Sequence, residues 1–290
     1  MALERNLAQI QAYKQQVSEE QQKLKDKMGK IKHKIAIISG KGGVGKSTVT
    51  VNLATAFAQK GNKVGVLDAD IHGPSVPRLL GLEGKQVTTF DEGAFPVTGP
   101  LGMKVMSMDF FLPEKTPTIW RGPLKMRAIR QLLSDIAWGQ LDFLFIDLPP
   151  GTGDEPLSIA QLLPEMDGVV IVTMPTALSS SVVKKAITFA RRLKMPIIGV
   201  VENMSGFVCP HCGWKTEIFL SGGGKKMAQE ANIPFLGSIP IDPKVGVYSD
   251  QGQPFVIAQQ DSAAAKAFST IVCNVEANLK NFATVKRLES

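Results

Sequence analysis

A glycine-rich run near the N-terminal end of the sequence has the residue types and spacing to bind phosphate. It follows an apolar strand-like run and precedes a stretch with helical periodicity, and it consists of Gly40, Lys41, Gly42, Gly43, Val44, Gly45, Lys46, Ser47 and Thr48. In that context the pattern GxxxxGK[ST] lets backbone N–H groups approach phosphate oxygens, while the start of the helix adds a positive dipole end. We expect Lys46 to contact the β- and γ-phosphates and the Ser47 hydroxyl to bind Mg²⁺. The sequence therefore predicts a site for a polyphosphate nucleotide.

The same glycines also fit a second phosphate-binding pattern. Gly40, Gly42 and Gly45 satisfy GxGxxG, and Asp68 stands about where a dinucleotide-binding fold places its ribose-binding acid. A dinucleotide pyrophosphate is held by backbone groups, however, and has no use for the neighbouring lysine and serine. We therefore favour a nucleoside triphosphate over NAD or FAD.

Carboxylates follow two further strand-like runs. Asp68 and Asp70 come after one apolar run, and Asp147 comes directly after another. Side chains at the carboxyl ends of parallel strands face the ligand crevice of an open α/β sheet. We expect Asp147 to hold a Mg²⁺-bound water as a Walker B acid does, Asp68 to support the Mg²⁺ shell, and Asp70 to orient the attacking water. The proline and glycine residues of 147–154 predict a segment that changes conformation when the γ-phosphate is lost.

A cysteine pair predicts a metal site. Cys209 and Cys212 form a CxxC motif in a predicted loop, 207–214, and this spacing lets two thiolates hold one metal ion or cluster. Such sites usually need four ligands, and a second copy of the loop across a two-fold axis can supply the other two. Cys273 lies among apolar residues of a helical pattern, so we expect it to be buried in the core. Thiolate chemistry leaves an iron-sulfur cluster, zinc and a dithiol redox pair open.

These motifs need a scaffold that brings strand ends together, and the rest of the chain is patterned accordingly. Strand-like and helix-like segments alternate from Lys34 onward, which predicts an α/β fold of three layers, a mostly parallel sheet flanked by helices. Strands are predicted at 34–39, 63–67, 103–107, 142–146, 168–173, 196–202 and 233–239. Helices are predicted at 47–60, 123–137, 155–163, 178–193, 223–231 and 262–279.

The first 30 residues differ from the rest of the chain. Residues 3–28 are almost entirely polar with a thin apolar stripe at helical spacing, which predicts a solvated helix, a short coiled coil in a dimer, or a docking segment. Residues 1–34 hold eight basic and four acidic side chains, and so contribute +4 to the net charge of +7. We therefore divide the chain into a basic helical leader, 1–30, and a P-loop domain, 31–290, which carries the metal loop 207–214.

Composition narrows the class of protein further. Hydrophobic residues make up 44% of the 290 residues, as in globular proteins. No apolar run approaches the ~20 residues of a membrane span, the first residues do not resemble a secretory signal, and three cysteines make no disulfide framework, so we expect a cytoplasmic protein. Residues 35–290 carry a net charge of only +3, which disfavours nucleic acid as a partner of the body of the protein.

Longer strings resemble known families. A lysine at the second position of the phosphate loop, Lys41, resembles the deviant P-loop ATPases, the class that holds the partitioning, septum-placing, arsenite-pump and nitrogenase iron-protein families. Within that class, three strings in this order resemble the Mrp (ApbC-type) ATPases, which carry iron-sulfur clusters: DADIHGPSVPRLLG at 68–81, DLPPGTGDE at 147–155 and ENMSGFVCPHCG at 202–213. The match runs over nearly the whole body of the chain, from about residue 34 to 270.

This resemblance implies a MgATP-hydrolysing homodimer in which Lys41 reaches the nucleotide of the other subunit. It implies a [4Fe-4S] cluster that bridges two subunits through Cys209 and Cys212 of each, with scaffold proteins as donors and apo iron-sulfur proteins as recipients. It also implies that Asn203 hydrogen-bonds the adenine and that the turn containing Pro240 and Asp242 borders the base. Independently of the resemblance, Asn203 directly follows a predicted strand, on the ligand side of the sheet.

Three other functions are compatible with parts of the sequence. A partitioning or septum-placing ATPase would use its dimer on DNA or a membrane, but it has no use for paired thiolates. An electron donor like the nitrogenase iron protein holds its cluster through single cysteines far apart in sequence, unlike the close pair here. A zinc-binding P-loop ATPase is the remaining alternative, because Cys-Pro-His-Cys-Gly also resembles half of a zinc ribbon.

Overall fold

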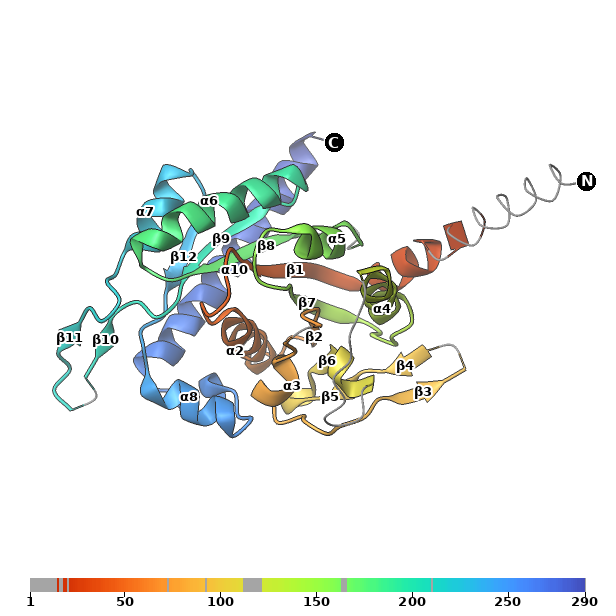
Figure 1. The fold of residues 1–290 in the computed structure, drawn as a ribbon, viewed down its shortest axis with the longest axis horizontal. Helices are drawn as coiled ribbons and strands as arrows, with labels where there is room; N and C mark the ends of the chain where they lie inside the picture. The colour runs from red at the N-terminus through yellow and green to blue at the C-terminus, as the bar shows by residue number, and fades with distance from the viewer. Residues whose placement is uncertain are drawn as a thin grey trace, which may run out of the picture.

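A computed structural model of the chain describes Gln15, Ser18, Glu19 and residues 21–71, 73–91, 93–111, 122–162, 166–209 and 211–289. Its centre is an eight-stranded sheet in the order β12-β9-β8-β1-β7-β2-β6-β5 (Figure 1). The strands are β1 (Ile31–Ser39), β2 (Val64–Asp68), β5 (Val97–Thr98), β6 (Lys104–Ser107), β7 (Leu141–Asp147), β8 (Gly168–Thr173), β9 (Ile197–Glu202) and β12 (Phe235–Ser238).

The sheet is parallel except at one edge, where β5 runs antiparallel to β6. Its central strands are rich in Val, Ile and Leu and almost entirely buried, as expected for strands covered on both faces. The register sets Asp68 at the end of β2 directly opposite Asp147 at the end of β7. The two predicted acids therefore stand side by side at the carboxyl edge of the sheet.

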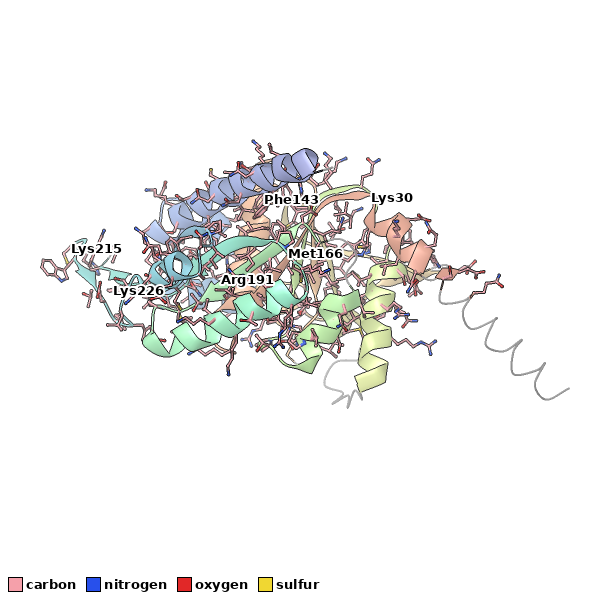
Figure 2. All side chains as sticks on the ribbon, turned by 90° about the horizontal axis from the view of Figure 1, so that it is seen from above. Lys30, Phe143, Met166, Arg191, Lys215 and Lys226 are labelled. Carbon is pink, nitrogen blue, oxygen red and sulfur yellow. The ribbon has the colours of Figure 1, made fainter. Side chains whose placement is uncertain are left out.

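Helices cover both faces of the sheet. On one face, α2 (Lys46–Gln59) packs on β1, β2 and β7 beside α10 (Ala263–Glu289), which packs on β9 and β12. On the other face lie α4 (Gly122–Ser134), α5 (Asp154–Leu162), α6 (Ala177–Arg192) and α7 (Gly223–Glu230). Figure 2 shows α10 and α6 on opposite sides of the strands. The predicted three-layer α/β fold is confirmed.

Every predicted strand and helix of the body is present, and their ends differ by a few residues in most cases. The exception is α10, which continues ten residues beyond the predicted end at 279. Besides β5, several further elements were not predicted, and all but one of them span two to four residues, too few to show a periodicity. They are α3 (Val76–Leu79), β3 (Thr88–Phe90), β4 (Gly93–Phe95), the 3-10 turns Pro100–Gly102 and Met108–Phe111, β10 (Phe207–Val208), β11 (Lys215–Thr216), α8 (Pro243–Asp250) and α9 (Phe255–Ala258).

The described end of the leader is part of the core. Residues 21–28 are helical, and Met28 is only 2% exposed, with Leu24 packed against the same cluster. Residues 3–14 of the predicted leader helix lie outside the described residues. The leader joins β1 at the amino edge of the sheet, at the opposite end of the molecule from the β10–β11 hairpin, as Lys30 and Lys215 show in Figure 2.

Among the described helices, none combines the length and the apolar character that a membrane crossing requires.

Candidate functional site

The phosphate-loop residues 40–45 form the turn between β1 and α2. Gly43 and Gly45 have φ of 77° and 80°, a left-handed conformation that favours glycine. A Cβ on Gly45 would lie 2.3 Å from Nδ2 of Asn203, and that amide donates a 2.9 Å hydrogen bond to the carbonyl of Val44. The loop is therefore shaped by its own glycines and by the segment after β9, which holds it from the side.

The start of α2 is suited to an anion. The helix begins at Lys46 after the left-handed Gly45, and no side chain of the described residues caps it, nor is any acid present in its first turn. Its first N–H groups and its positive dipole end thus point toward the loop without a protein acceptor. A Cβ built on Gly42 or on Gly43 would meet nothing within 4 Å, so this side of the loop is open. These features fit a phosphate chain.

Lys46, Ser47 and Asp147 form a buried cluster under the loop. The Lys46 ammonium lies 2.7 Å from Oδ2 of Asp147, and the Ser47 hydroxyl donates to the same oxygen over 2.5 Å. Thr50 donates to the other carboxylate oxygen over 2.7 Å. Asp147 is completely buried and Lys46 is 6% exposed. The structure thus places the predicted Mg²⁺ ligand Ser47 beside the predicted Walker B acid, two oxygen donors of the kind Mg²⁺ prefers.

Asp68 is also buried, but it contacts the backbone rather than the serine hydroxyl. Its Oδ2 accepts from the N–H groups of Ser75 and Val76 at the start of α3, and its Oδ1 accepts from the N–H of Asp70. Burial first, and then the charge of Asp147, raise the pKa of Asp68 to about 8. Asp68 therefore fixes the loop that follows β2 and lies close enough to Asp147 to feel its charge.

Two further predicted residues sit at the rim of the cluster. Asp70 is half-buried, and its Oδ1 accepts from the N–H of Gly73 over 3.2 Å, so it lies next to the cluster without belonging to it. Lys41 is half-buried, and its carbonyl accepts from the Ser39 hydroxyl over 2.9 Å. Across the described ranges, no carboxylate forms an ion pair with the Lys41 ammonium.

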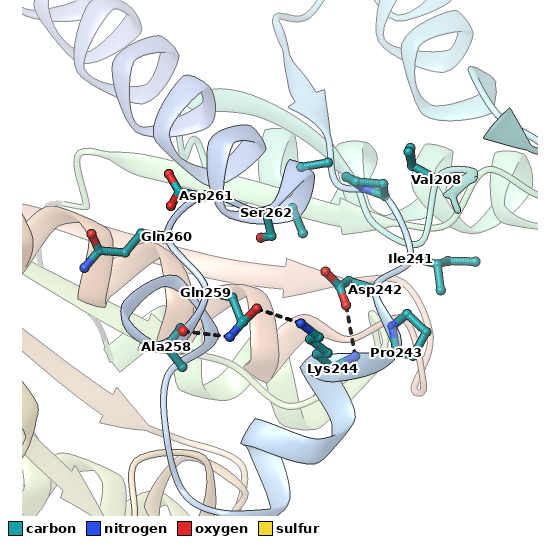
Figure 3. A pocket seen from close by; sticks show the side chains of 13 residues that line it. Val208, Ile241, Asp242, Pro243, Lys244, Ala258, Gln259, Gln260, Asp261 and Ser262 are labelled. Carbon is teal, nitrogen blue, oxygen red and sulfur yellow. Dashed lines mark hydrogen bonds between the residues drawn. The ribbon is translucent and has the colours of Figure 1, made fainter. Parts of the chain in front are cut away.

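Pro240 and Asp242 line a pocket of about 630 Å³, drawn in Figure 3. Asp242 caps α8 by accepting from the N–H of Lys244, whose ammonium donates to Gln259 over 3.0 Å on the opposite wall. Val208, within the metal loop 207–214, also lines this pocket. Asn203 does not line it: its amide contacts the phosphate loop instead. The structure thus brings the predicted base-site residues to two adjacent places rather than one.

The CxxC pair lies at the end of the two-stranded hairpin β10–β11, which projects from the body at the left of Figure 1. Cys209 is half-buried and Cys212 is exposed. The N–H groups of Cys212 and then of His211 donate to the Cys209 sulfur, the Cys212 thiol adds a further hydrogen bond, and together they hold the pKa of Cys209 below its ordinary value. The two thiols converge, and a lowered thiol pKa favours the thiolate that binds metal.

The hairpin supplies two ligands and no more. Within the described part of the chain, no cluster of three or more His, Cys, Asp or Glu side chains is placed to bind a metal ion. The pair is followed by exposed apolar side chains, of which Trp214 is 74% exposed and Leu220 is 55% exposed. The described residues thus offer two of the four ligands of a tetrahedral site at this hairpin, and the other two must come from outside this set.

The prediction for Cys273 was wrong, because this cysteine is exposed on α10. The buried face of α10 includes Ile271, Val272 and Val275. Position 273 lies about 100° around the helix from position 272 and so falls off that face. Its apolar neighbours in the sequence therefore did not show on which face of α10 this cysteine lies.

Two buried polar residues of the site were not predicted. Thr50 is fully buried and donates to Asp147. Glu202 ends β9 and is also fully buried. The sequence did contain a signal for Glu202, because it directly follows an apolar strand, as Asp68 and Asp147 do.

Comparisons with known proteins agree with this geometry. Residues 30–276 match a family model described as ParA: NUBPL iron-transfer P-loop NTPase. An iron-sulfur cluster carrier protein of Saccharolobus solfataricus is 53% identical over 262 residues, which cover 90% of this chain and 88% of that one. A solved nucleotide-binding protein in complex with ADP from Archaeoglobus fulgidus is 44% identical with a TM-score of 0.75, covering 86% of this chain and 96% of that one. The MinD cell division protein of Aquifex aeolicus, 22% identical with a TM-score of 0.63 and covering 84% and 97% of the two chains, shares the fold alone.

Proposed function

The chain belongs to the NUBPL iron-transfer P-loop NTPase family, and on that premise we propose that it is an ATP-hydrolysing carrier that assembles a [4Fe-4S] cluster between two copies of itself. The cluster is its cargo, received from scaffold proteins and passed to apo iron-sulfur proteins. One observation carries the proposal: Cys209 and Cys212 converge on a projecting hairpin that offers two ligands where a cluster needs four.

The proposed nucleotide binding rests on the buried cluster under the phosphate loop. Lys46 and Ser47 both contact Asp147 and both stand at the anion-binding start of α2. When MgATP binds, Lys46 turns to the β- and γ-phosphates while Ser47 and Asp147 hold the ion and its water. Mg²⁺, when bound there, would neutralise negative charge on the phosphates. Asp70, at the rim, orients the attacking water.

Lys41 acts on the nucleotide of the partner subunit in this proposal. Its ammonium has no ion-pair partner among the described residues, and its half-buried position at the loop leaves it accessible to a facing copy. A cation placed there offsets the charge that develops on the phosphates in the transition state. The dimer is thus needed at both sites, for the nucleotide and for the cluster.

The base of the nucleotide lies between Asn203 and the turn of Pro240 and Asp242. The Asn203 amide is 8% exposed and adjacent to the loop, and the pocket of about 630 Å³ beside the turn has room for a purine. In this arrangement Asn203 keeps its bond to Val44 through one N–H and presents its remaining amide atoms to the adenine.

The cysteine pair fits a cluster through its donor set. Hydrogen bonds to the Cys209 sulfur stabilise its thiolate, and two hairpins facing each other across a two-fold axis provide four thiolates. The family match favours iron over zinc and over a dithiol redox pair. A MinD-like positioning role is supported only by the shared fold and does not account for the hairpin.

Anaerobic reconstitution with iron and sulfide tests the proposal. We expect the chain to take up about two irons each, one cluster for two chains, with a thiolate-to-iron absorption band and a mass that shifts to the dimer. Cys209→Ala should lose the cluster, whereas the matched control Cys273→Ala, which removes an exposed cysteine of α10, should retain it. Uptake of zinc alone, or equal iron in Cys209→Ala and wild type, contradicts the proposal.

A further inference from the structure

The six residues between β9 and Cys209, 203–208, link the phosphate loop, the pocket wall and the cysteine pair. Asn203 contacts the phosphate loop at Val44. Two residues further on, the N–H of Ser205 donates to Ile239 over 2.9 Å, and the N–H of Ile241 donates to Gly206 over 2.8 Å, beside the pocket of Figure 3. The chain then enters β10 and reaches Cys209. One short stretch of backbone therefore connects the phosphate loop, the pocket wall and the metal loop.

Glu202 directly precedes this stretch, at what we call the root of the metal loop. Both of its carboxylate oxygens accept hydrogen bonds. Its Oε1 accepts from the Ser205 hydroxyl, from the N–H of Gly222 over 3.0 Å and from the Ser238 hydroxyl over 3.3 Å. Its Oε2 accepts from the N–H of Gly224. The side chain is completely buried, and no lysine or arginine of the described ranges forms an ion pair with it.

Three of these donors lie on the two sides of the segment that carries the metal loop, and the fourth, Ser238, ends β12. The chain leaves the body after Glu202 and returns at the start of α7, so Ser205 is on the outgoing side and Gly222 and Gly224 are on the returning side. A single carboxylate thus fastens the two sides together, and the positive end of α7 helps to hold it. A Cβ on Gly224 would lie 3.0 Å from Oε2, which explains the glycine-rich start of that helix.

The hairpin depends on this fastening because it has little structure of its own. The strands β10 and β11 pair through only two residues each, and a two-stranded hairpin of that size is not stable alone. Cys212 and Trp214 at its tip are exposed, while Phe207 and Val208 at its base are half-buried beside Ile241. The position of the cysteines is therefore set mainly at the root.

The segment 147–154, which we predict to change conformation when the γ-phosphate is lost, follows a different strand. It follows β7, which is separated from β9 by β1 and β8. Among the described residues, Asn203, next to Glu202, connects the phosphate loop to the stretch that leads to the metal loop.

We propose that Glu202 is a positioning residue that fixes the root of the metal loop, and that Asn203 ties this root to the phosphate loop so that bound nucleotide changes the exposure of Cys209 and Cys212. The inference rests on the proposed function for its nucleotide and its cargo. It concerns how the two sites communicate, and it requires no iron to be tested. Coupling of this kind must alter the thiols and the nucleotide affinity reciprocally.

Thiol reactivity of the metal-free, full-length protein tests it. In a Cys273→Ser background, only Cys209 and Cys212 react with a chromogenic disulfide, and the rate is measured with and without the magnesium complex of a non-hydrolysable ATP analogue. Nucleotide affinity is measured in parallel by titration with a fluorescent analogue.

Two variants weaken the contacts of Glu202. Glu202→Gln replaces one acceptor oxygen, and Ser205→Ala is the milder change because it removes a single donor. Ser221→Ala is the matched control, because its hydroxyl donates to Glu217 rather than to Glu202.

We expect nucleotide to change the thiol rate of the reference protein and of Ser221→Ala by about fivefold or more. In Glu202→Gln and Ser205→Ala the ratio should fall close to one while nucleotide still binds with the reference affinity. If Glu202→Gln does not fold, Ser205→Ala decides.

The inference is overturned if both variants keep the full nucleotide effect, or if nucleotide binds the reference protein without changing its thiols. Failure to bind nucleotide at all overturns it together with the proposed function. Failure to retain iron contradicts the proposed function alone, because the thiol measurement uses no metal.

Discussion

Asp68 and Asp147 carry the same functional group at the ends of neighbouring strands, yet their surroundings differ. Asp147 is surrounded by Lys46, Ser47 and Thr50, which supply one cation and two hydroxyl donors. Asp68 receives only backbone N–H groups, and the charge of Asp147 opposes its ionisation. One acid is thus equipped to work as a carboxylate beside the phosphates, and the other holds a proton more tightly.

The raised pKa of Asp68 predicts a pH dependence of stability. Between about pH 4 and pH 8 the unfolded chain has lost this proton while the folded chain keeps it, so stability falls as pH rises and levels off above about 8. Urea unfolding of metal-free wild type and Asp68→Asn at pH 5 to 9 measures it. The wild type should lose stability relative to the variant across this range, and parallel curves would show that Asp68 titrates normally.

At the scale of elements, the connection between β1 and α2 is held by two independent constraints. Gly45 has a left-handed backbone conformation, which favours glycine. Its lack of a Cβ also leaves room for the Asn203 amide that contacts Val44. Because β9 approaches the loop through this amide, the phosphate site is built by two separate strand ends. The same packing places the metal hairpin within reach of the loop.

Gly45→Ala should therefore damage both stability and nucleotide binding. The left-handed conformation alone costs a residue with a Cβ about 1–2 kcal/mol, and the new methyl group would displace Asn203. Gly42→Ala is the control, since a Cβ there meets nothing and the position has no positive φ. Urea unfolding without nucleotide should show a loss for Gly45→Ala and a change within about 0.5 kcal/mol for Gly42→Ala. Equal stability of the two variants would refute the steric argument.

At the scale of the whole molecule, the two ends of the parallel strands carry different parts of the protein. The carboxyl ends of β1, β2, β7 and β9 meet at one edge and bring together the phosphate loop, the acids and the metal hairpin. The leader enters at the other edge (Figure 1). A second copy that faces the carboxyl edge would meet both the nucleotide and the cysteines, which is the geometry that a shared cluster requires.

Mixing two inactive variants tests whether Lys41 acts across that dimer. Lys46→Ala destroys the phosphate site of its own chain, and Lys41→Ala removes the cation given to the other chain. In a mixed dimer, one site has its own Lys46 and the partner's Lys41, so an equal mixture should recover about a quarter of the wild-type ATPase rate. The separate variants should remain inactive. A mixture as inactive as its components would place Lys41 on its own chain's nucleotide.

The sequence determined the features that depend on neighbouring residues. The phosphate loop, the CxxC pair and the alternating strands and helices are local patterns, because periodicity, glycine turns and short ligand spacings are set within a few residues. The strings that resemble a known family indicated further site residues, such as Asn203. For that reason the fold and the positions of Lys46, Ser47 and Asp147 at the site could be predicted before the structure was known.

Only the tertiary structure decided which distant residues meet. Asp68 lies opposite Asp147 because of the strand register, Asn203 braces the phosphate loop because β9 ends beside it, and Glu202 joins both sides of the metal loop. Cys273 faces solvent because of the rotation of α10 about its axis. These contacts depend on how strands and helices dock, which pairs residues far apart in the chain and leaves no periodic trace in the sequence.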